Sequence, residues 1–350
     1  MHNLKQPALG LLSSAFVIVF SLLFISLFPF PVLSGWVSYL LQCLIPAQIM
    51  VGVFWKCKHP RFACTQRQPI KGLLLFLITI VAAAVIAPAY FKVAGGGIAP
   101  PTPMLAHATI ISVVIMFWLA IIWDGWPFNV LIPGPVAAGV TTLTACYAIT
   151  LVFFRIFFNY EFMRAAPVYV SSLDPHGLFN AWSALVVSVM ALSVMFLMLH
   201  FDLWPMTLLG FLMKQPLLGL VWTAVAVILG GMFFELGTGI LKMDPVSFLV
   251  RVPIPFIFGT IIVLNMFQNS LFGRLAQPLK GLANTAAVMA IGTVLARLYG
   301  GLASAVTGPL TSGPPAYESE IWLASALLSV TFPFLIFFAE FFEFWPLKKG

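Results

Sequence analysis

The chain has 350 residues, of which 61% are hydrophobic and only 8% are charged, and its mean hydropathy is +1.06. A water-soluble globule of this size needs more polar surface than that composition supplies, so the sequence indicates an integral membrane protein. The formal net charge of +7 does not indicate a nucleic-acid-binding protein, because the basic residues lie in short loops between apolar runs and form no stripe.

The apolar runs predict transmembrane helices. They are about 20 residues long, as a helix that crosses a bilayer requires, whereas a barrel strand would alternate over about 10 residues. We therefore expect an all-α integral membrane protein. The first run is expected to be a retained helix, since no small-residue cleavage site follows it. The ten expected helices cover residues 8–28, 36–55, 72–91, 105–123, 135–158, 178–201, 216–234, 248–267, 282–305 and 321–341.

The loop after the second run predicts the orientation. Residues 56–71 contain five basic residues and no acid, and short loops with this bias stay in the cytoplasm. With ten spans both termini are then cytoplasmic, in agreement with the tail Lys348-Lys349. We expect a multi-pass protein of the cell's inner (plasma) membrane.

A short motif recurs along the chain. It consists of an aromatic residue, an acid, any residue, Trp and Pro, at residues 123–127, 201–205 and 342–346. Each copy ends a helix that runs inward, and weaker copies are expected at Trp55 and at residues 268–273. The spacing predicts one membrane domain, 1–350, made of five tandem helical hairpins, a plan that recurs in transporters. The hairpins are expected at residues 8–55, 72–126, 135–204, 216–272 and 282–345.

The acids near this motif are candidate gating or ion- or proton-binding residues. They are Asp124, Asp202, Glu343 and, one turn before the last, Glu340. Ionisable groups at membrane depth are costly and tend to face a cavity. The competing interpretation is structural: the Trp lies in the interfacial aromatic belt and the acid is solvated by headgroups or water.

Three other charges lie close to the apolar layer. Arg155, Glu235 and Arg297 are candidates for an intramembrane charge pair or a substrate contact. The competing interpretation is that the long arginine side chains extend to the membrane surface.

Two outer loops contain Asp-Pro pairs. Asp174-Pro175 and Asp244-Pro245 are both expected to begin helices, because Asp caps free backbone amides and Pro fits the first helical position.

The sequence predicts no catalytic, cofactor-binding or metal-binding residues. His107 and His200 lie near opposite membrane surfaces, too far apart to ligate one haem. The spacing of Cys57 and Cys64 does not match a zinc site, and the chain has no nucleotide-binding or hydrolase motif. An enzyme is therefore the less favoured class.

Two functions remain open. The first is a transporter or permease for a small solute, with coupling to a proton or another ion left open. The alternative is a non-catalytic integral subunit that anchors or assembles partner proteins. The lipid bilayer is the expected partner, further membrane subunits or a homo-oligomer are open alternatives, and no nucleic-acid partner is expected.

Overall fold

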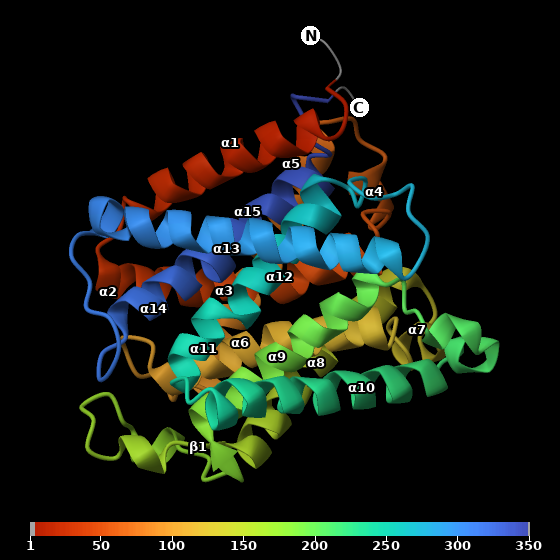
Figure 1. Cartoon of the computed structure of the whole chain (residues 1–350). Helices are drawn as coiled ribbons and strands as arrows, with labels where there is room; N and C mark the ends of the chain where they lie inside the picture. Colours follow the sequence, from red (N-terminus) through yellow and green to blue (C-terminus); the bar gives the residue numbers. More distant parts are fainter. Residues whose placement is uncertain (1–3, 349–350) are drawn as a thin grey trace.

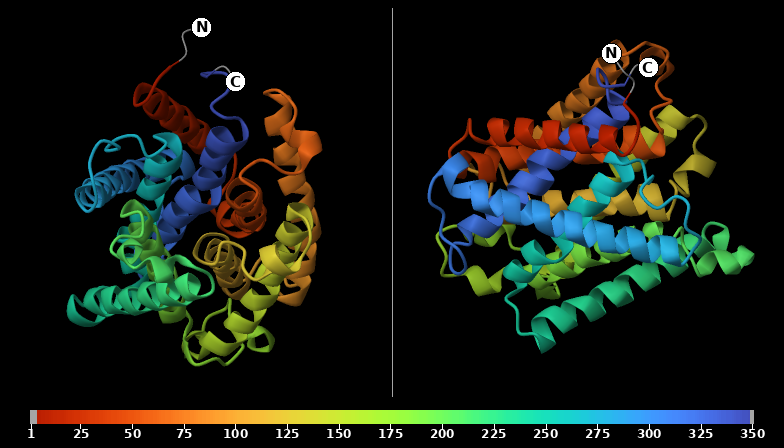
Figure 2. Two further views of the ribbon diagram at one scale, coloured as in Figure 1. Left: turned by 90° about the vertical axis from the view of Figure 1, so that its right-hand side faces the viewer. Right: turned by 45° about the horizontal axis from the view of Figure 1, so that its top comes forward.

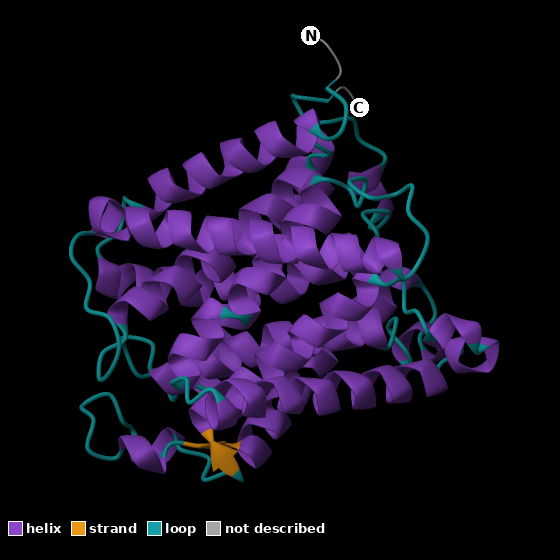
Figure 3. Ribbon diagram, in the orientation of Figure 1, coloured by secondary structure: helices purple, strands orange, loops and turns teal. Residues whose placement is uncertain are grey.

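The computed structural model describes residues 4–348, and this part of the chain is almost entirely helical (Figures 1 and 3). Ten of its helices are long and apolar enough to cross a membrane. The prediction of a helical, multi-pass membrane protein is therefore confirmed. Lys349 of the predicted tail lies outside the described residues. Among those residues the only strands are β1 (Phe158–Asn159) and β2 (Phe179–Asn180), which form a short parallel pair.

We number the spans 1 to 10 in chain order. The odd-numbered spans are nearly uninterrupted helices, and span 7 continues from α10 through a wider helical turn to Ile240. They are α1 (Ala8–Ile25), α5 (Ile70–Val93), α8 (Pro135–Phe157), α10 (Leu217–Phe234) and α13 (Leu279–Thr307).

The even-numbered spans are more often broken into segments, and four of them end in a wide turn with hydrogen bonds from residue i to residue i−5. Span 2 comprises α2 (Phe30–Val32) and α3 (Ser38–Ile49), span 4 is α6 (Pro103–Phe117), span 6 is α9 (Ala181–His200), span 8 comprises α11 (Pro245–Arg251) and α12 (Pro253–Ile261), and span 10 comprises α14 (Glu318–Ala324) and α15 (Phe332–Ile336). The loops contain the short helices α4 (Arg61–Cys64) and α7 (Phe128–Leu131).

The even-numbered spans form a closed inner ring. Helix α3 contacts α6, α6 contacts α9, α9 contacts α12, α12 contacts α15, and α15 contacts α3 again. In these spans 61–78% of the residues in the apolar stretch are buried, against 22–44% in the odd-numbered spans. The inner ring is therefore the core of the molecule.

The odd-numbered spans lie around this ring, and the left-hand view of Figure 2 looks along both layers. Each packs between two inner spans: α5 against spans 2 and 10, α8 against spans 4 and 2, and α10 against spans 6 and 4. In the same way α13 packs against spans 8 and 6, and α1 against spans 10 and 8. Helix α1, although first in the chain, thus lies against spans 8 and 10 and completes the outer layer.

One end of the molecule has the same local geometry at five places. We call it the corner end; it is where even spans end and odd spans begin, at the right of Figure 1. Each even span ends there at an aromatic residue followed by two residues with left-handed backbone, with φ between 46° and 72°. The aromatic residues are Trp55, Trp123, Phe201, Phe267 and Phe342.

Four odd spans begin with the sequence Gln-Pro-x-x-Gly, starting at Gln6, Gln68, Gln215 and Gln277. In each case the glutamine amide donates a hydrogen bond to the last backbone carbonyl of an even span, at 2.7–3.1 Å from the oxygen. The glutamine oxygen accepts from the glycine amide of its own helix at 3.0–3.2 Å. We call this arrangement the lock.

The glycine of each lock lies against the aromatic residue that ends the same even span. A Cβ on Gly219, for example, would lie 2.7 Å from the Trp123 ring. The fifth odd span uses a variant: Gly139 lies against the Trp55 ring, and Trp55 Nε1 donates to the Pro135 carbonyl at 2.7 Å. Every odd span is thus fixed to the end of an even span.

The locks also correct the alignment of the recurring motif. The position of Trp55 corresponds to Trp123, the first aromatic residue of the motif, and the weak fourth copy begins at Phe267 rather than Gln268. From span 3 onward the odd spans pack along their length on the even span that precedes them, as α5 does on α3. The grouping into five tandem hairpins stays a prediction.

We expect Gly219→Ala to destabilise the protein by about 1–3 kcal/mol, because the added methyl group would overlap the Trp123 ring. The measurement is thermal unfolding of the purified protein in detergent. Gly231→Ala is the control, since it lies on the same helix and a Cβ there meets nothing within 4 Å. Equal unfolding temperatures for the two variants would contradict the role assigned to the lock.

Candidate functional site at the centre of the helix ring

A cavity of about 190 Å³ lies inside the inner ring, among the last turns of the even spans before the corner end. All five inner spans contribute to its wall, which is mainly aliphatic and aromatic. Only Gln48, Asn265 and Glu340 bring polar side chains to it. The wall is formed by Gln48, Ile49, Gly52, Val53, Phe117, Ile121, Phe196, Leu199, Ile261, Leu264, Asn265, Phe332, Ile336 and Glu340.

Glu340 is the one acid in this wall. It lies in the wide turn Phe337–Phe341 that ends span 10, and its side chain is half-buried. Asn265 Nδ2, from the wide turn that ends span 8, donates to Glu340 Oε1 at 2.8 Å. Gly52 lies opposite, where a Cβ would be 3.9 Å from Glu340 Cβ. Wide helical turns of this kind occur often at functional sites, because they redirect side chains out of the regular helical spacing.

Gln48 is fully buried in the same wall. Its Nε2 donates to the Pro333 carbonyl of span 10 at 3.3 Å, while its Oε1 has no hydrogen-bond partner among the described residues. Gln48 Oε1 is therefore a buried acceptor without a donor among the described residues, which is a costly arrangement.

A second hollow, of about 410 Å³, lies at the corner end. We call it the vestibule. Glu340 lines the vestibule as well as the cavity. The vestibule is basic, and it is lined by Lys56, Cys57, Lys58, Lys71, Gln268, Ala339, Glu340, Glu343, Phe344 and Lys348.

Two vestibule groups are already engaged. Lys71 forms an ion pair with Glu343, and the Cys57 thiol donates to the Glu340 carbonyl at 3.5 Å. Burial, together with the nearby Glu340 carboxylate, raises the pKa of Cys57 to about 12, so the thiol stays protonated at neutral pH. No ion pair involves Glu340 among the described residues. Glu340 is therefore an uncompensated carboxylate between an apolar cavity and a basic vestibule.

The other three candidate acids lie on the exposed side of the corners. Asp202 forms an ion pair with Lys280 at 2.8 Å, and it also accepts from Gln277 Nε2 at 2.8 Å. Partial burial raises the pKa of Asp202, but the hydrogen bonds from Lys280 and Gln277 outweigh this and hold the pKa below its usual value. Glu343 is paired with Lys71, and Asp124 is exposed. Of the four acids only Glu340 lines the cavity.

The candidate charge pair is not assembled in this structure. Arg155, Glu235 and Arg297 lie on three different outer helices, and all three are exposed on the surface of the bundle. None of them forms an ion pair within residues 4–348. Their placement is that of side chains extending along the lipid-facing layer.

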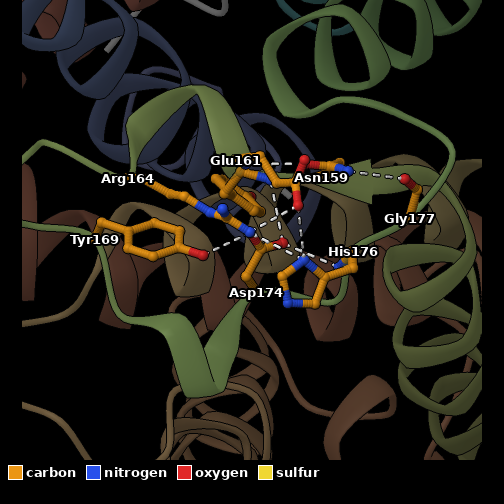
Figure 4. A network of polar contacts seen from close by, with 8 residues as sticks. Asn159, Glu161, Arg164, Tyr169, Asp174, His176 and Gly177 are labelled. Carbon is orange, nitrogen blue, oxygen red and sulfur yellow. Dashed lines mark hydrogen bonds and ion pairs between the residues drawn. The ribbon is translucent and has the colours of Figure 1, made fainter.

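A polar network lies at the end opposite the corners (Figure 4). The buried Asp174 carboxylate accepts from the backbone amides of Tyr160 and His176, at 3.1 and 3.0 Å, and from the Tyr169 hydroxyl at 3.0 Å. His176 Nδ1 lies 3.7 Å from carboxylate oxygens of Asp174 and Glu161. The network orders the long loop between spans 5 and 6.

The helix-capping prediction is correct for one Asp-Pro pair and wrong for the other. Asp244 caps α11 by accepting from the Ser247 amide at 2.9 Å. Asp174 caps no helix, because α9 begins later, at Ala181, where Asn180 is the cap. The Asp174 carboxylate instead accepts hydrogen bonds from groups within the loop.

Two features of the site were missed in the sequence. Gln48 is a single amide in an apolar run, and its role depends on which way its helix faces. The four Gln-Pro-x-x-Gly segments could have been found, since they recur at the start of four predicted helices.

No protein-family model, curated protein or solved structure matches the chain.

The Asp202–Lys280 pair predicts a pH-dependent stability. Because the pKa of Asp202 is lowered by folding, its ionised form stabilises the fold above about pH 4, and this contribution is lost as the pH falls through the lower folded pKa. Asp202→Asn should therefore lower the unfolding temperature slightly at pH 6, and by less near pH 3.

Asp124→Asn is the matched control, since Asp124 is the equivalent corner acid without a lysine partner. It should leave the unfolding temperature nearly unchanged at both pH values. A wild-type unfolding temperature for Asp202→Asn at pH 6 would show that the ion pair contributes nothing.

Proposed function

We propose that the chain is a transporter or permease for a small solute, with its path along the axis of the inner ring. One observation carries this proposal: a single uncompensated carboxylate, Glu340, lines both the central cavity and the vestibule. A carboxylate in an apolar wall is costly, and acids kept at such positions commonly line the path of an ion, proton or solute. A subunit that only anchors partners needs neither the hollow nor the acid.

Glu340 is the proposed coupling residue. In its ionised form it attracts a proton or another cation, and in its protonated form the cavity wall carries no charge. Asn265 donates to the carboxylate and holds it at the boundary between the two hollows. Alternating occupancy by a proton and a solute at such a position is a simple means of coupling.

We also infer that the chain consists of five copies of a two-span unit. The four locks, the Trp55–Gly139 variant and the five pairs of left-handed residues support this inference, because they occur at corresponding places in the chain. The basic vestibule supports a cytoplasmic corner end, and therefore cytoplasmic termini, by the same charge bias that orients short loops.

The proposal predicts that uptake depends on Glu340. Proteoliposomes containing the purified chain would be incubated with a mixed pool of small solutes under an imposed pH gradient, filtered, and analysed by mass spectrometry. We expect at least one solute to accumulate above the level of protein-free vesicles, and Glu340→Gln to reduce its rate about tenfold or more, because the substitution removes the one charge in the cavity wall.

Glu235→Gln is the control, since it removes an exposed acid on an outer helix and should leave uptake unchanged. If no solute accumulates, and the chain instead purifies in fixed ratio with other membrane proteins, the anchoring function is the correct one.

A further inference from the structure

We propose that the central cavity binds a small organic cation, a primary ammonium group with a short apolar body. This inference rests on the proposed function, since it names the class of solute that the same site would carry. It is argued from the hydrogen-bond donors and acceptors in the cavity wall.

The two amides of the wall each use one of their two N–H groups within the protein, and the wall also holds an acceptor without a donor. Gln48 Nε2 donates to the Pro333 carbonyl, and Gln48 Oε1 has no donor among the described residues. Asn265 Nδ2 donates to Glu340. These bonds also fix the orientation of both amides, because the reverse orientation would place oxygen against oxygen.

Glu340 supplies the charge. One of its oxygens accepts from Asn265, and no lysine or arginine among the described residues pairs with the carboxylate. An ammonium group has three donors and a positive charge, so it can satisfy both the carboxylate and the acceptors beside it. A ligand with a carboxylate group would be repelled by the negative charge of Glu340.

The rest of the wall suits a short hydrocarbon body. Phe117, Phe196 and Phe332 come from three different inner spans and stand beside aliphatic side chains. Aromatic faces attract cations in addition to apolar groups. A cavity of about 190 Å³ restricts the ligand to a small molecule.

The lysines of the vestibule do not make the cavity a site for anions. They line the vestibule and not the cavity, and Lys71 is neutralised by Glu343. Lys56, Lys58 and Lys348 are exposed, so solvent and salt screen their charges. Alone they would favour an anion, which makes anion binding the competing outcome of the test.

The test is calorimetric titration of the full chain in detergent with n-butylammonium, and with butyrate and 1-butanol as matched probes of equal chain length. We expect saturable binding of n-butylammonium only. Glu340→Gln should weaken it at least about tenfold, as expected for loss of a charge-assisted hydrogen bond. Gln48→Leu should weaken it less, and Glu235→Gln, which removes an exposed acid that lines neither hollow, should leave it unchanged.

Several results would overturn the proposal. They are binding of butyrate in place of n-butylammonium, binding of none of the three probes, and equal n-butylammonium affinity in the wild type and in Glu340→Gln. If Glu340→Gln does not fold, Gln48→Leu decides, and an unchanged affinity there counts against the site.

The two proposals fail separately. Glu340-dependent uptake of some solute without n-butylammonium binding would retain the path and reject the cation. Binding of n-butylammonium without uptake of any solute would retain the site and reject transport.

Discussion

The fold depends on how the ends of the inner helices satisfy their backbone carbonyls. The last carbonyls of a helix have no partner within the helix, and such groups are costly near the apolar layer of a membrane. Here the glutamine of a neighbouring odd span donates to the last carbonyl of spans 4, 6, 8 and 10. The glycine one turn later lets the aromatic residue of the same corner pack against the helix. Each lock thus supplies the missing hydrogen-bond donor and also allows the two helices to pack closely.

This constraint also positions the candidate site. Because the ends of the inner spans are held from outside, the wide turns before them have fixed places in the ring. The turns of the neighbouring spans 8 and 10 bring Asn265 and Glu340 within hydrogen-bonding distance. Gln48, which also lines the cavity, donates to the Pro333 carbonyl of span 10. The polar groups of the site belong to the inner ring, and the contacts that hold them belong to the outer one.

The helices could be predicted from the sequence because a membrane span has a simple physical requirement, a sufficient apolar length. The separation into two rings could not, because a helix facing lipid and a helix facing the core are equally apolar. Spans 6 and 7 have the same mean hydropathy of 2.3, yet 61% of the first and 22% of the second is buried. Glu340 was identified as a candidate because acids are rare in such runs, whereas Gln48 is an ordinary polar residue until its neighbours are known. Asp174 was assigned to a cap because the Asp-Pro pair is a local signal, and the contacts that actually use its carboxylate come from Tyr160 and Tyr169.

The lock of the first span imposes an order on biogenesis. Gln6 donates to the Met266 carbonyl, 260 residues further along the chain. A ribosome delivers span 1 to the bilayer first, and its partner, span 8, follows only after six more spans. During that time the first helix has lipid where its final neighbours will be, and its glutamine has no carbonyl to meet. Closure of the outer layer is therefore a late, long-range event in the maturation of the protein.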